Sequence, residues 1–505
     1  MSEPGSVQKS EPGSVQKPEP GSVQKPGPGS VQKPEPGSVQ LTEPSGDGQP
    51  GLRAGLRRRH MTMIAIGGAI GAGLFVGSGS VIETAGPAAI LSYAGAGLVV
   101  LCVLRALGEM VVARPVAGSM GEYARMAMGP FAGFTVGWLY WYLYVILVGA
   151  EAVAGAAILG NWIDLDQWIL SAGLLVVMTA VNLVSVKSFG EFEFWFASIK
   201  VVAIVAFLAI GLAWVFGLWP GSDAGFANLT RHGGFAPNGI GGVFSAIVVV
   251  MFAFGGTEIV TVAAAESKEP GPAVARATNN VLWRVGLFYV ASIFLVVTIL
   301  PWNDAKVLTS PFVSALEHIG IPAAGTIMQV VILTAVLSVL NSAIYVSSRM
   351  LYVLTRDGDA PASLVKLNKR GVPARAVLLG TVAAWGAVIA SYVSPDKVFT
   401  FLVNSIGVVL AFVYVAIMFS QLRLRARLRR EDPSALTYRM WGYPYISWAV
   451  IIALFAVFVA MARNPDQRNQ LFASTISLLA VMAIYPLRAK FGRKKPVRDV
   501  EVLHH

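Results

Sequence analysis

A series of apolar runs constrains this chain more than any other feature, because it fills the sequence from about residue 61 to about residue 487. Most runs have the roughly 20 residues that a helix needs to cross the hydrocarbon core of a bilayer. Only 13% of the residues are charged, whereas soluble domains carry about 25%. The sequence therefore predicts an all-α integral membrane protein with twelve transmembrane helices. The cores of the predicted spans are 61–82, 87–110, 131–157, 168–187, 195–219, 239–263, 277–300, 323–353, 375–393, 398–420, 445–463 and 469–487.

The chain is basic, with a net charge of +11 at pH 7. A basic chain can bind nucleic acid, but this one has no fold motif or basic face of the required kind. Its Lys and Arg residues gather instead in short loops, about 26 of them in the even-numbered junctions and termini and about 5 in the odd-numbered loops. Cytoplasmic loops carry such an excess. We therefore expect both termini in the cytoplasm, a multi-pass location in the cell inner (plasma) membrane, and no nucleic-acid partner.

Both ends of the chain differ in composition from the apolar middle. The heptapeptide EPGSVQK recurs at 3–9, 11–17 and 19–25. A segment so rich in Pro and Gly buries too little apolar surface to offset chain entropy, which predicts a disordered cytoplasmic tail over residues 1–55. A partner-binding tail is the alternative. The membrane domain is expected over 56–490, and 491–505 form a basic cytoplasmic tail.

Glycine clusters interrupt two of the predicted spans. The first span contains GGAIGAG over 67–73, and the sixth contains FAFGGTE over 252–258. Because each Gly inside a helix costs about 1 kcal/mol relative to Ala, two clusters five spans apart indicate discontinuous helices, which form substrate sites in inverted-repeat transporters. Free amides at a half-helix end suit a carboxylate and free carbonyls suit an ammonium, and an amino acid has both groups. The alternative is that these glycines only let helices pack closely.

Three ionisable residues lie at membrane depth, where such groups are functional candidates. Lys200 lies in span five. It is interpreted as a fixed cation or as a lysine that exchanges a proton, and the alternative is that its side chain extends to the membrane interface. Glu258 follows the predicted break in span six. It is either a functional carboxylate or a carboxylate whose hydrogen bonds are satisfied by a neighbouring helix. Glu151 lies toward the outer end of span three and faces either an outer vestibule or the interface.

Two polar pairs lie inside apolar spans, Asn341 with Ser342 in span eight and Asn404 with Ser405 in span ten. Each pair is a vestibule or substrate contact or, alternatively, a hydrogen-bonded link between helices. All histidines fall in loops or tails, and the chain has no phosphate-binding G-x-x-x-x-G-K-[ST] loop. The sequence therefore predicts no catalytic residues, no metal site, no cofactor and no enzyme activity.

Several stretches together resemble the amino acid–polyamine–organocation superfamily, and within it the bacterial amino acid transporter family. The likeness covers about residues 55–490. The stretches are 59–63 (RHMTM), 70–79 (IGAGLFVGSG), 137–141 (GWLYW), 188–195 (SFGEFEFW), 256–260 (GTEIV) and 348–352 (SRMLY). Among members of the family the chain is most similar to γ-aminobutyrate permeases, through 151–155 (EAVAG) and 316–320 (LEHIG).

The resemblance implies a LeuT-type fold of two inverted five-helix repeats plus two peripheral helices. The first repeat would cover 61–219, the second 239–420, and the peripheral helices 445–487. It also implies uptake coupled to protons, with Lys200 in place of a sodium ion of sodium-coupled relatives and Glu258 linked to substrate or proton sensing. Phe252 matches an aromatic gate position, with a smaller ring than the tryptophan of some relatives.

The resemblance also assigns the substrate-binding positions. Amides around Gly71 would hold the substrate carboxylate, and carbonyls near both breaks would face the ammonium. The implied substrate-binding residues are Ile66, Gly67, Ile70, Gly71, Ala72, Gly73, Phe252, Ala253, Phe254 and Gly256.

These features lead to a hypothesis of proton symport of a small zwitterionic amino acid, most simply γ-aminobutyrate. The expected partners are the amino acid, protons and the lipid bilayer, and the oligomeric state is left open. The same family with proline, asparagine, an aromatic residue or D-alanine/glycine as substrate is the first alternative. An amino-acid-sensing receptor or a channel is the alternative class.

Overall fold

The computed structural model describes residues 70–116, 120–184, 186–222, 225–258, 270–368 and 372–490. Within these ranges every regular element is a helix. The predicted tails 1–55 and 491–505 lie outside the described residues, as do Ile66 and Gly67 and the end of the predicted span 239–263.

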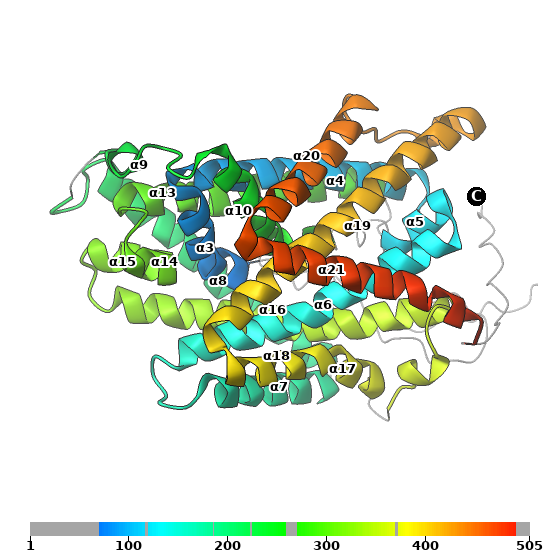
Figure 1. Cartoon of the computed structure of the whole chain (residues 1–505), viewed down its shortest axis with the longest axis horizontal. Coiled ribbons are helices and arrows are strands. Elements are labelled where there is room, and N and C mark those ends of the chain that lie inside the picture. Colours follow the sequence, from blue (N-terminus) through cyan, green and yellow to red (C-terminus); the bar gives the residue numbers. More distant parts are fainter. Residues whose placement is uncertain are drawn as a thin grey trace, which may run out of the picture. The chain divides into compact units, whose positions relative to one another are not determined.

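Figure 1 shows the helices in chain order. Up to residue 254 they are α2 (Ala72–Phe75), α3 (Gly77–Ala85), η1 (Gly86–Ala88), α4 (Ala89–Ala113), α5 (Met120–Met128), α6 (Pro130–Leu159), α7 (Gln167–Val184), α8 (Val186–Val215), α9 (Asn228–Arg231) and α10 (Gly239–Phe254). From residue 270 they are α12 (Pro270–Arg284), η2 (Val285–Val290), α13 (Ala291–Ile299), α14 (Ala305–Thr309), α15 (Pro311–His318), α16 (Ala324–Arg356), η3 (Ala362–Val365), α17 (Ala374–Gly380), α18 (Val382–Val393), α19 (Pro395–Glu431), η4 (Pro433–Ala435), α20 (Tyr445–Arg463), α21 (Pro465–Ile484) and η5 (Tyr485–Lys490).

Nine helical segments of the described chain are long and apolar enough to cross a membrane, where the sequence predicts twelve spans. They are Ala72–Ala113, Pro130–Leu159, Glu193–Val215, Pro272–Ile299, Ala324–Arg356, Ala374–Val393, Lys397–Glu431, Tyr445–Arg463 and Gln467–Arg488. The difference has a physical reason. One segment, Ala72–Ala113, covers parts of two predicted spans, which Gly86 (φ +63°) and Pro87 separate. Two further apolar helices, Gln167–Leu183 and Gly239–Phe254, are shorter.

Helix α6 lies inside the bundle and α21 lies at its periphery. In its most apolar stretch α6 is 83% buried, whereas the corresponding stretch of α21 is 11% buried. Helix α6 is apolar all round, which is typical of a helix with neighbours on every side. It packs against α5, α7, α16, α18 and α19.

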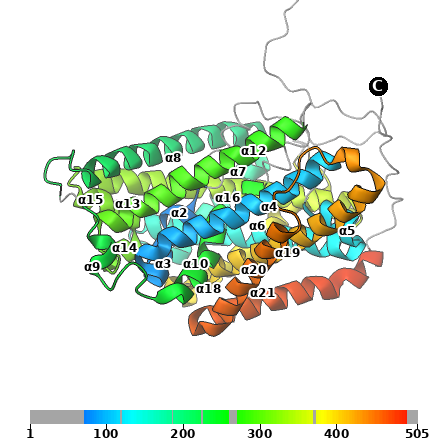
Figure 2. The ribbon, with the colours of Figure 1, turned by 90° about the horizontal axis from the view of Figure 1, so that it is seen from above.

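The packing brings the two predicted breaks into the interior. The short helix α2 contacts α10 and α16, and α16 in turn contacts α6 and α8. Helix α8 also packs along α13, as can be followed in Figure 2. The start of α2 therefore lies against α10 and α16, and α16 links it to α6 and α8.

Candidate functional site

The described part of the predicted break in the first span begins at Ile70 and Gly71. Ile70 is not helical, Gly71 is extended (φ −142°, ψ −150°), and α2 begins only at Ala72. A helix start leaves backbone amides without partners inside the helix. The backbone here is therefore able to bind side chains or a ligand.

The break in the sixth span lies at the end of α10, after Phe254. Gly256 has φ +91°, a conformation that Gly adopts without the penalty that a side chain brings. The final carbonyls of α10 find partners close by. Phe252 accepts a hydrogen bond from the Gly255 amide at 3.0 Å, and Ala253 accepts one from the Tyr289 hydroxyl at 3.0 Å.

The two breaks touch each other. A Cβ atom built on Gly73 would lie 2.6 Å from the Cα atom of Ala253. A Cβ atom on Gly71 would lie 2.6 Å from Val339 of α16 and 2.9 Å from the carboxylate of Glu151. The glycines are therefore needed for the close approach of α2, α10, α16 and α6, and close packing accompanies the backbone breaks.

Glu151 lies against the first break. Its carboxylate accepts a hydrogen bond from the Ala72 amide at 3.3 Å, and its side chain is 1% exposed. This position on α6 is inside the bundle and not at the interface. One of the amides that the sequence assigns to a substrate carboxylate thus already faces a carboxylate of the protein.

Lys200 of α8 binds the same break from the other side. Its Nζ atom donates to the Ile70 carbonyl at 3.0 Å and to the Ser338 hydroxyl at 2.8 Å. The side chain is fully buried, so it does not reach the interface. The Ser338 hydroxyl also lies 2.7 Å and 2.8 Å from the two carboxylate oxygens of Glu193, and Ser342 donates to that carboxylate at 3.1 Å.

Sequence reasoning missed Glu193 and Ser338 as functional residues. One signal was available for Glu193, which precedes Lys200 by seven residues on the same helix. Seven residues make about two helical turns, so both side chains lie on one face of α8. No charge or glycine marks Ser338, although Ser342 lies four residues later on the same face of α16.

Glu258 lies next to the second break and is fully buried. One carboxylate oxygen accepts hydrogen bonds from the Tyr140 hydroxyl at 2.8 Å and from the Gly256 amide at 3.2 Å. The other oxygen accepts a longer bond from the Tyr414 hydroxyl at 3.4 Å. The Tyr144 ring packs edge-on against Tyr140, with ring centroids 5.2 Å apart. Two helices, α6 and α19, and the segment after α10 thus converge on Glu258.

The predicted polar pairs separate in the structure. Asn341 accepts a hydrogen bond from Asn182 of α7 at 2.8 Å, and this bond links two helices. Ser342 joins the Glu193 carboxylate, as described above. Asn404 donates to the Thr400 carbonyl within α19 at 3.0 Å, and the Ser405 carbonyl accepts from Ser474 of α21 at 3.5 Å. Neither of these last two bonds reaches α2 or α10.

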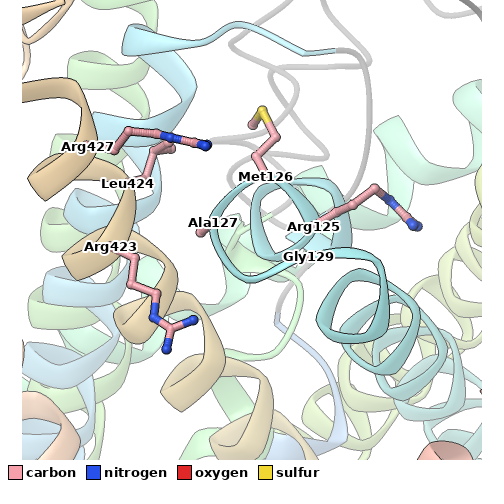
Figure 3. A pocket seen from close by; sticks show the side chains of 7 residues that line it. All are labelled: Arg125, Met126, Ala127, Gly129, Arg423, Leu424 and Arg427. Atoms are coloured by element: carbon pink, nitrogen blue, oxygen red, sulfur yellow. The ribbon is translucent and has the colours of Figure 1, made fainter. Parts of the chain in front are cut away.

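A basic hollow lies apart from these breaks, between α5 and α19 (Figure 3). Its volume is about 420 Å³, and it is lined by Arg125, Met126, Ala127, Gly129, Arg423, Leu424 and Arg427. Arg125 is already paired with Glu122 at 3.1 Å and with Asp359. None of the predicted site residues lines this hollow. The described residues also contain no group of His, Cys, Asp or Glu that could hold a metal ion.

Comparison with known families assigns the chain. The family described as amino acid permease matches residues 60–502, which cover both breaks and every helix described above. The chain belongs to the amino acid permease family. Members of this family are membrane transporters and not enzymes, so this permease is a multi-pass membrane protein with an amino acid as its substrate.

Three relatives place the permease within the family. It is 51% identical over 439 residues to the γ-aminobutyric acid permease of Bacillus subtilis (strain 168), with 86% of this chain and 94% of the relative covered. It is 46% identical over 457 residues to the γ-aminobutyric acid permease of Escherichia coli (strain K12), with 89% and 98% covered. It is 42% identical over 431 residues to the aromatic amino acid transport protein of Corynebacterium glutamicum, with 84% and 93% covered.

The permease also shares its fold with a solved transporter. A manganese transporter of Eremococcus coleocola superposes with a TM-score of 0.52 at 12% sequence identity, covering 86% of this chain and 94% of the other. At this identity the likeness concerns the fold alone, which is that of an all-helical membrane transporter.

Proposed function

We propose that this permease imports γ-aminobutyrate across the cell inner membrane by proton symport. The choice of γ-aminobutyrate as substrate rests on the 51% and 46% sequence identity to two γ-aminobutyric acid permeases. The alignment with this chain covers almost the whole length of each of them. The lower 42% identity to an aromatic amino acid transporter makes aromatic residues the first competitors to test.

The proposed architecture has twelve transmembrane helices, arranged as two inverted five-helix repeats of the LeuT type over 61–219 and 239–420. Two peripheral helices over 445–487 follow, and the 11% burial of the apolar stretch of α21 supports a peripheral place for the last of them. The tails 1–55 and 491–505 would lie in the cytoplasm.

In this proposal the substrate lies where the two breaks meet. The extended backbone at Gly71 and the start of α2 would bind the substrate carboxylate, and carbonyls at the end of α10 would face the ammonium. The contact between Gly73 and Ala253 supports a single site that both breaks build. Because γ-aminobutyrate separates its charges by more atoms than an α-amino acid does, a second group is needed at the ammonium end. Glu258, held beside the second break, is the proposed group.

Lys200 is the proposed coupling residue. Its ammonium is bonded to the Ile70 carbonyl, so gain or loss of its proton acts directly on the backbone of the first break. Transport and protonation are thereby linked without a metal ion.

Uptake of labelled γ-aminobutyrate into proteoliposomes tests the function. The purified permease is given an inward proton gradient, with and without sodium, and with excess unlabelled phenylalanine, proline, asparagine or D-alanine as competitors. We expect accumulation that does not need sodium and that collapses when a protonophore is added. If the permease accumulates another amino acid and not γ-aminobutyrate, the proposed substrate is wrong and the family assignment still holds. Equilibration without concentration would indicate a channel.

A further inference from the structure

Four side chains and one carbonyl form a continuous hydrogen-bonded chain between α8 and α16. It runs from the Ile70 carbonyl to Lys200 (3.0 Å), then to Ser338 (2.8 Å), and then to Glu193 (2.7 Å and 2.8 Å). Ser342 closes it with a bond to Glu193 at 3.1 Å. Lys200, Ser338 and Glu193 are each fully buried, so solvent does not separate them.

The chemistry of these groups fixes the direction of the hydrogen bonds. A lysine ammonium only donates and an ionised carboxylate only accepts, whereas a hydroxyl has one hydrogen to donate and lone pairs to accept. Ser338 therefore accepts from Lys200 and donates to Glu193. Hydrogen bonds that all point the same way form a path along which a proton can pass.

Building on the proton coupling proposed above, we propose that Glu193 accepts the proton of Lys200 through the Ser338 hydroxyl. In this step an N–H bond of Lys200 breaks as an O–H bond to Ser338 forms. The original O–H bond of Ser338 breaks as an O–H bond to the Glu193 carboxylate forms. Lys200 becomes a neutral amine, Glu193 a neutral carboxylic acid, and Ser338 keeps one hydrogen. The total charge is unchanged.

The position of Glu193 gives the transfer a direction. Glu193 lies seven residues before Lys200 on α8, nearer to the start of that helix at Val186. At 1.5 Å per residue, the two positions are separated by about 10 Å along the helix. The proton thus moves from the break toward the end of the span. Neutralising both groups also lowers the cost of burying two charges, and it weakens the bond that holds the Ile70 carbonyl.

Other charges face the same lysine and have to be held constant in any test. Glu151 of α6 and Arg284 of α12 both act electrostatically on Lys200, in addition to Glu193. Variants confined to Ser338, Ser342 and Glu193 leave these two groups in place.

The competing explanation is that Glu193 only fastens α8 to α16. The two serines separate the explanations, because both bind Glu193 but only Ser338 also contacts Lys200. The variants are Ser338→Ala, Ser338→Thr, Ser342→Ala and Glu193→Gln. Ser347→Ala is a control for loss of a buried hydroxyl on α16, because among the described residues Ser347 bonds only the Ile344 carbonyl of its own helix.

Each variant is measured in two assays in proteoliposomes. Counterflow of labelled γ-aminobutyrate at equal pH needs no net proton movement, whereas uptake driven by a pH gradient does. A positioned proton-transfer group contributes about 10²- to 10⁴-fold to a rate. We therefore expect Ser338→Ala and Glu193→Gln to lower gradient-driven uptake at least about tenfold more than counterflow. Ser338→Thr is expected to restore it, and Ser342→Ala and Ser347→Ala to keep the ratio of the wild type.

If Ser338→Ala and Ser342→Ala lose the same activity in both assays, the proton relay is refuted. Glu193 then only holds α8 against α16. Infrared difference spectra between acidic and alkaline buffer keep the test independent of transport. We expect one component of the band of protonated buried carboxyl groups, beside any contribution of Glu151 and Glu258, to be lost in Glu193→Gln and kept in Ser342→Ala. A band that Glu193→Gln leaves unchanged refutes the relay. A wild type that shows this band but no gradient-driven uptake contradicts the proposed function and leaves the proton transfer supported.

Discussion

At the scale of the residue, the buried carboxylates of this permease differ in the donors that hold them. Glu151 binds a single backbone amide, Glu193 binds two serine hydroxyls, and Glu258 binds two tyrosines, the Thr257 hydroxyl and an amide. A buried carboxylate is stable only when such donors replace water. These three sets of donors show that the same residue type serves three different local structures.

Glu258→Gln tests the link between the second break and the substrate. Hydrogen bonds to charged groups contribute about 1.5–3 kcal/mol, so we expect about a tenfold or greater loss of γ-aminobutyrate affinity and an altered dependence of uptake on pH. Binding is measured by scintillation proximity and uptake over a range of pH. Glu83→Gln, on the exposed side of α3, is the control. Unchanged affinity and pH response in Glu258→Gln would refute the role.

Lys200→Ala tests the coupling residue. Because its ammonium is bonded to Ile70 at the first break, we expect loss of proton-driven accumulation with some exchange retained. The two activities are compared in the same proteoliposomes, with Lys306→Ala on the exposed surface of α14 as the control. Full accumulation in Lys200→Ala would contradict the coupling role.

Gly73→Ala tests the contact between the breaks. The added methyl group would meet the Ala253 backbone at 2.6 Å, and overpacking costs about 1–3 kcal/mol. We expect a lower midpoint of thermal denaturation in detergent and weaker binding of γ-aminobutyrate. Gly173→Ala of α7 is the control, since its added methyl group meets no described atom within 4 Å apart from its chain neighbours and the backbone of its own helix. Similar midpoints for the two variants would show that α2 and α10 separate at little cost.

At the scale of the element, buried polar contacts join helices that are far apart in the sequence. Glu109 of α4 accepts hydrogen bonds from Gln421 and Arg425 of α19, each at 2.8 Å, and from the Met440 amide. Glu109 is 1% exposed at its side chain and Arg425 is 7% exposed. This cluster fixes α4, α19 and the segment before α20 to one another.

Glu109→Ala is expected to destabilise the permease by about 3–5 kcal/mol, because it leaves the charge of Arg425 buried without its partner. Thermal denaturation in detergent measures the loss. Glu431→Gln removes an exposed ion pair with Arg427 of the same helix and is expected to change stability by about 0–1 kcal/mol. A fall in stability no larger than that of Glu431→Gln would show that water reaches Arg425.

Sequence reasoning located the elements better than it located their contacts. The lengths of the apolar runs predicted an all-helical membrane protein, which is confirmed. The glycine cluster of the sixth span lies where α10 ends, whereas the residues before Ile70 lie outside the described part of the chain, so the break in the first span stays a prediction. The partners of the buried charges come from distant parts of the chain. Lys200 and the Ile70 carbonyl are 130 residues apart, and Glu109 and Arg425 are 316 apart. Spacing within one helix carries no information about such pairs, so Ser338, Tyr140 and Tyr414 were not predicted.

At the scale of the whole molecule, the charge distribution predicts which loops face the cytoplasm. Arg423, Arg427 and Arg125 line the hollow between α5 and α19. The loop after α13 and the loop after α16 follow successive predicted spans, so they are expected on opposite sides of the membrane. The single cysteine, Cys102, is buried.

Cysteine labelling in a Cys102→Ser background tests this arrangement. Asn303→Cys places a thiol in the loop after α13, and Ser363→Cys places one after α16, and both positions are exposed. We expect a membrane-impermeant maleimide to label only Asn303→Cys in intact cells and both variants after permeabilisation. Labelling of Ser363→Cys alone in intact cells would invert the predicted orientation.

The contact between Gly73 and Ala253 also limits how this chain can diverge in evolution. A side chain at position 73 collides with the backbone of Ala253, so Ala253→Gly cannot compensate for it. No pair of substitutions at positions 73 and 253 is therefore neutral as long as α2 and α10 stay at their present separation. New substrate preferences have to arise from side chains around the breaks, such as those of α6 and α16, while position 73 itself stays fixed.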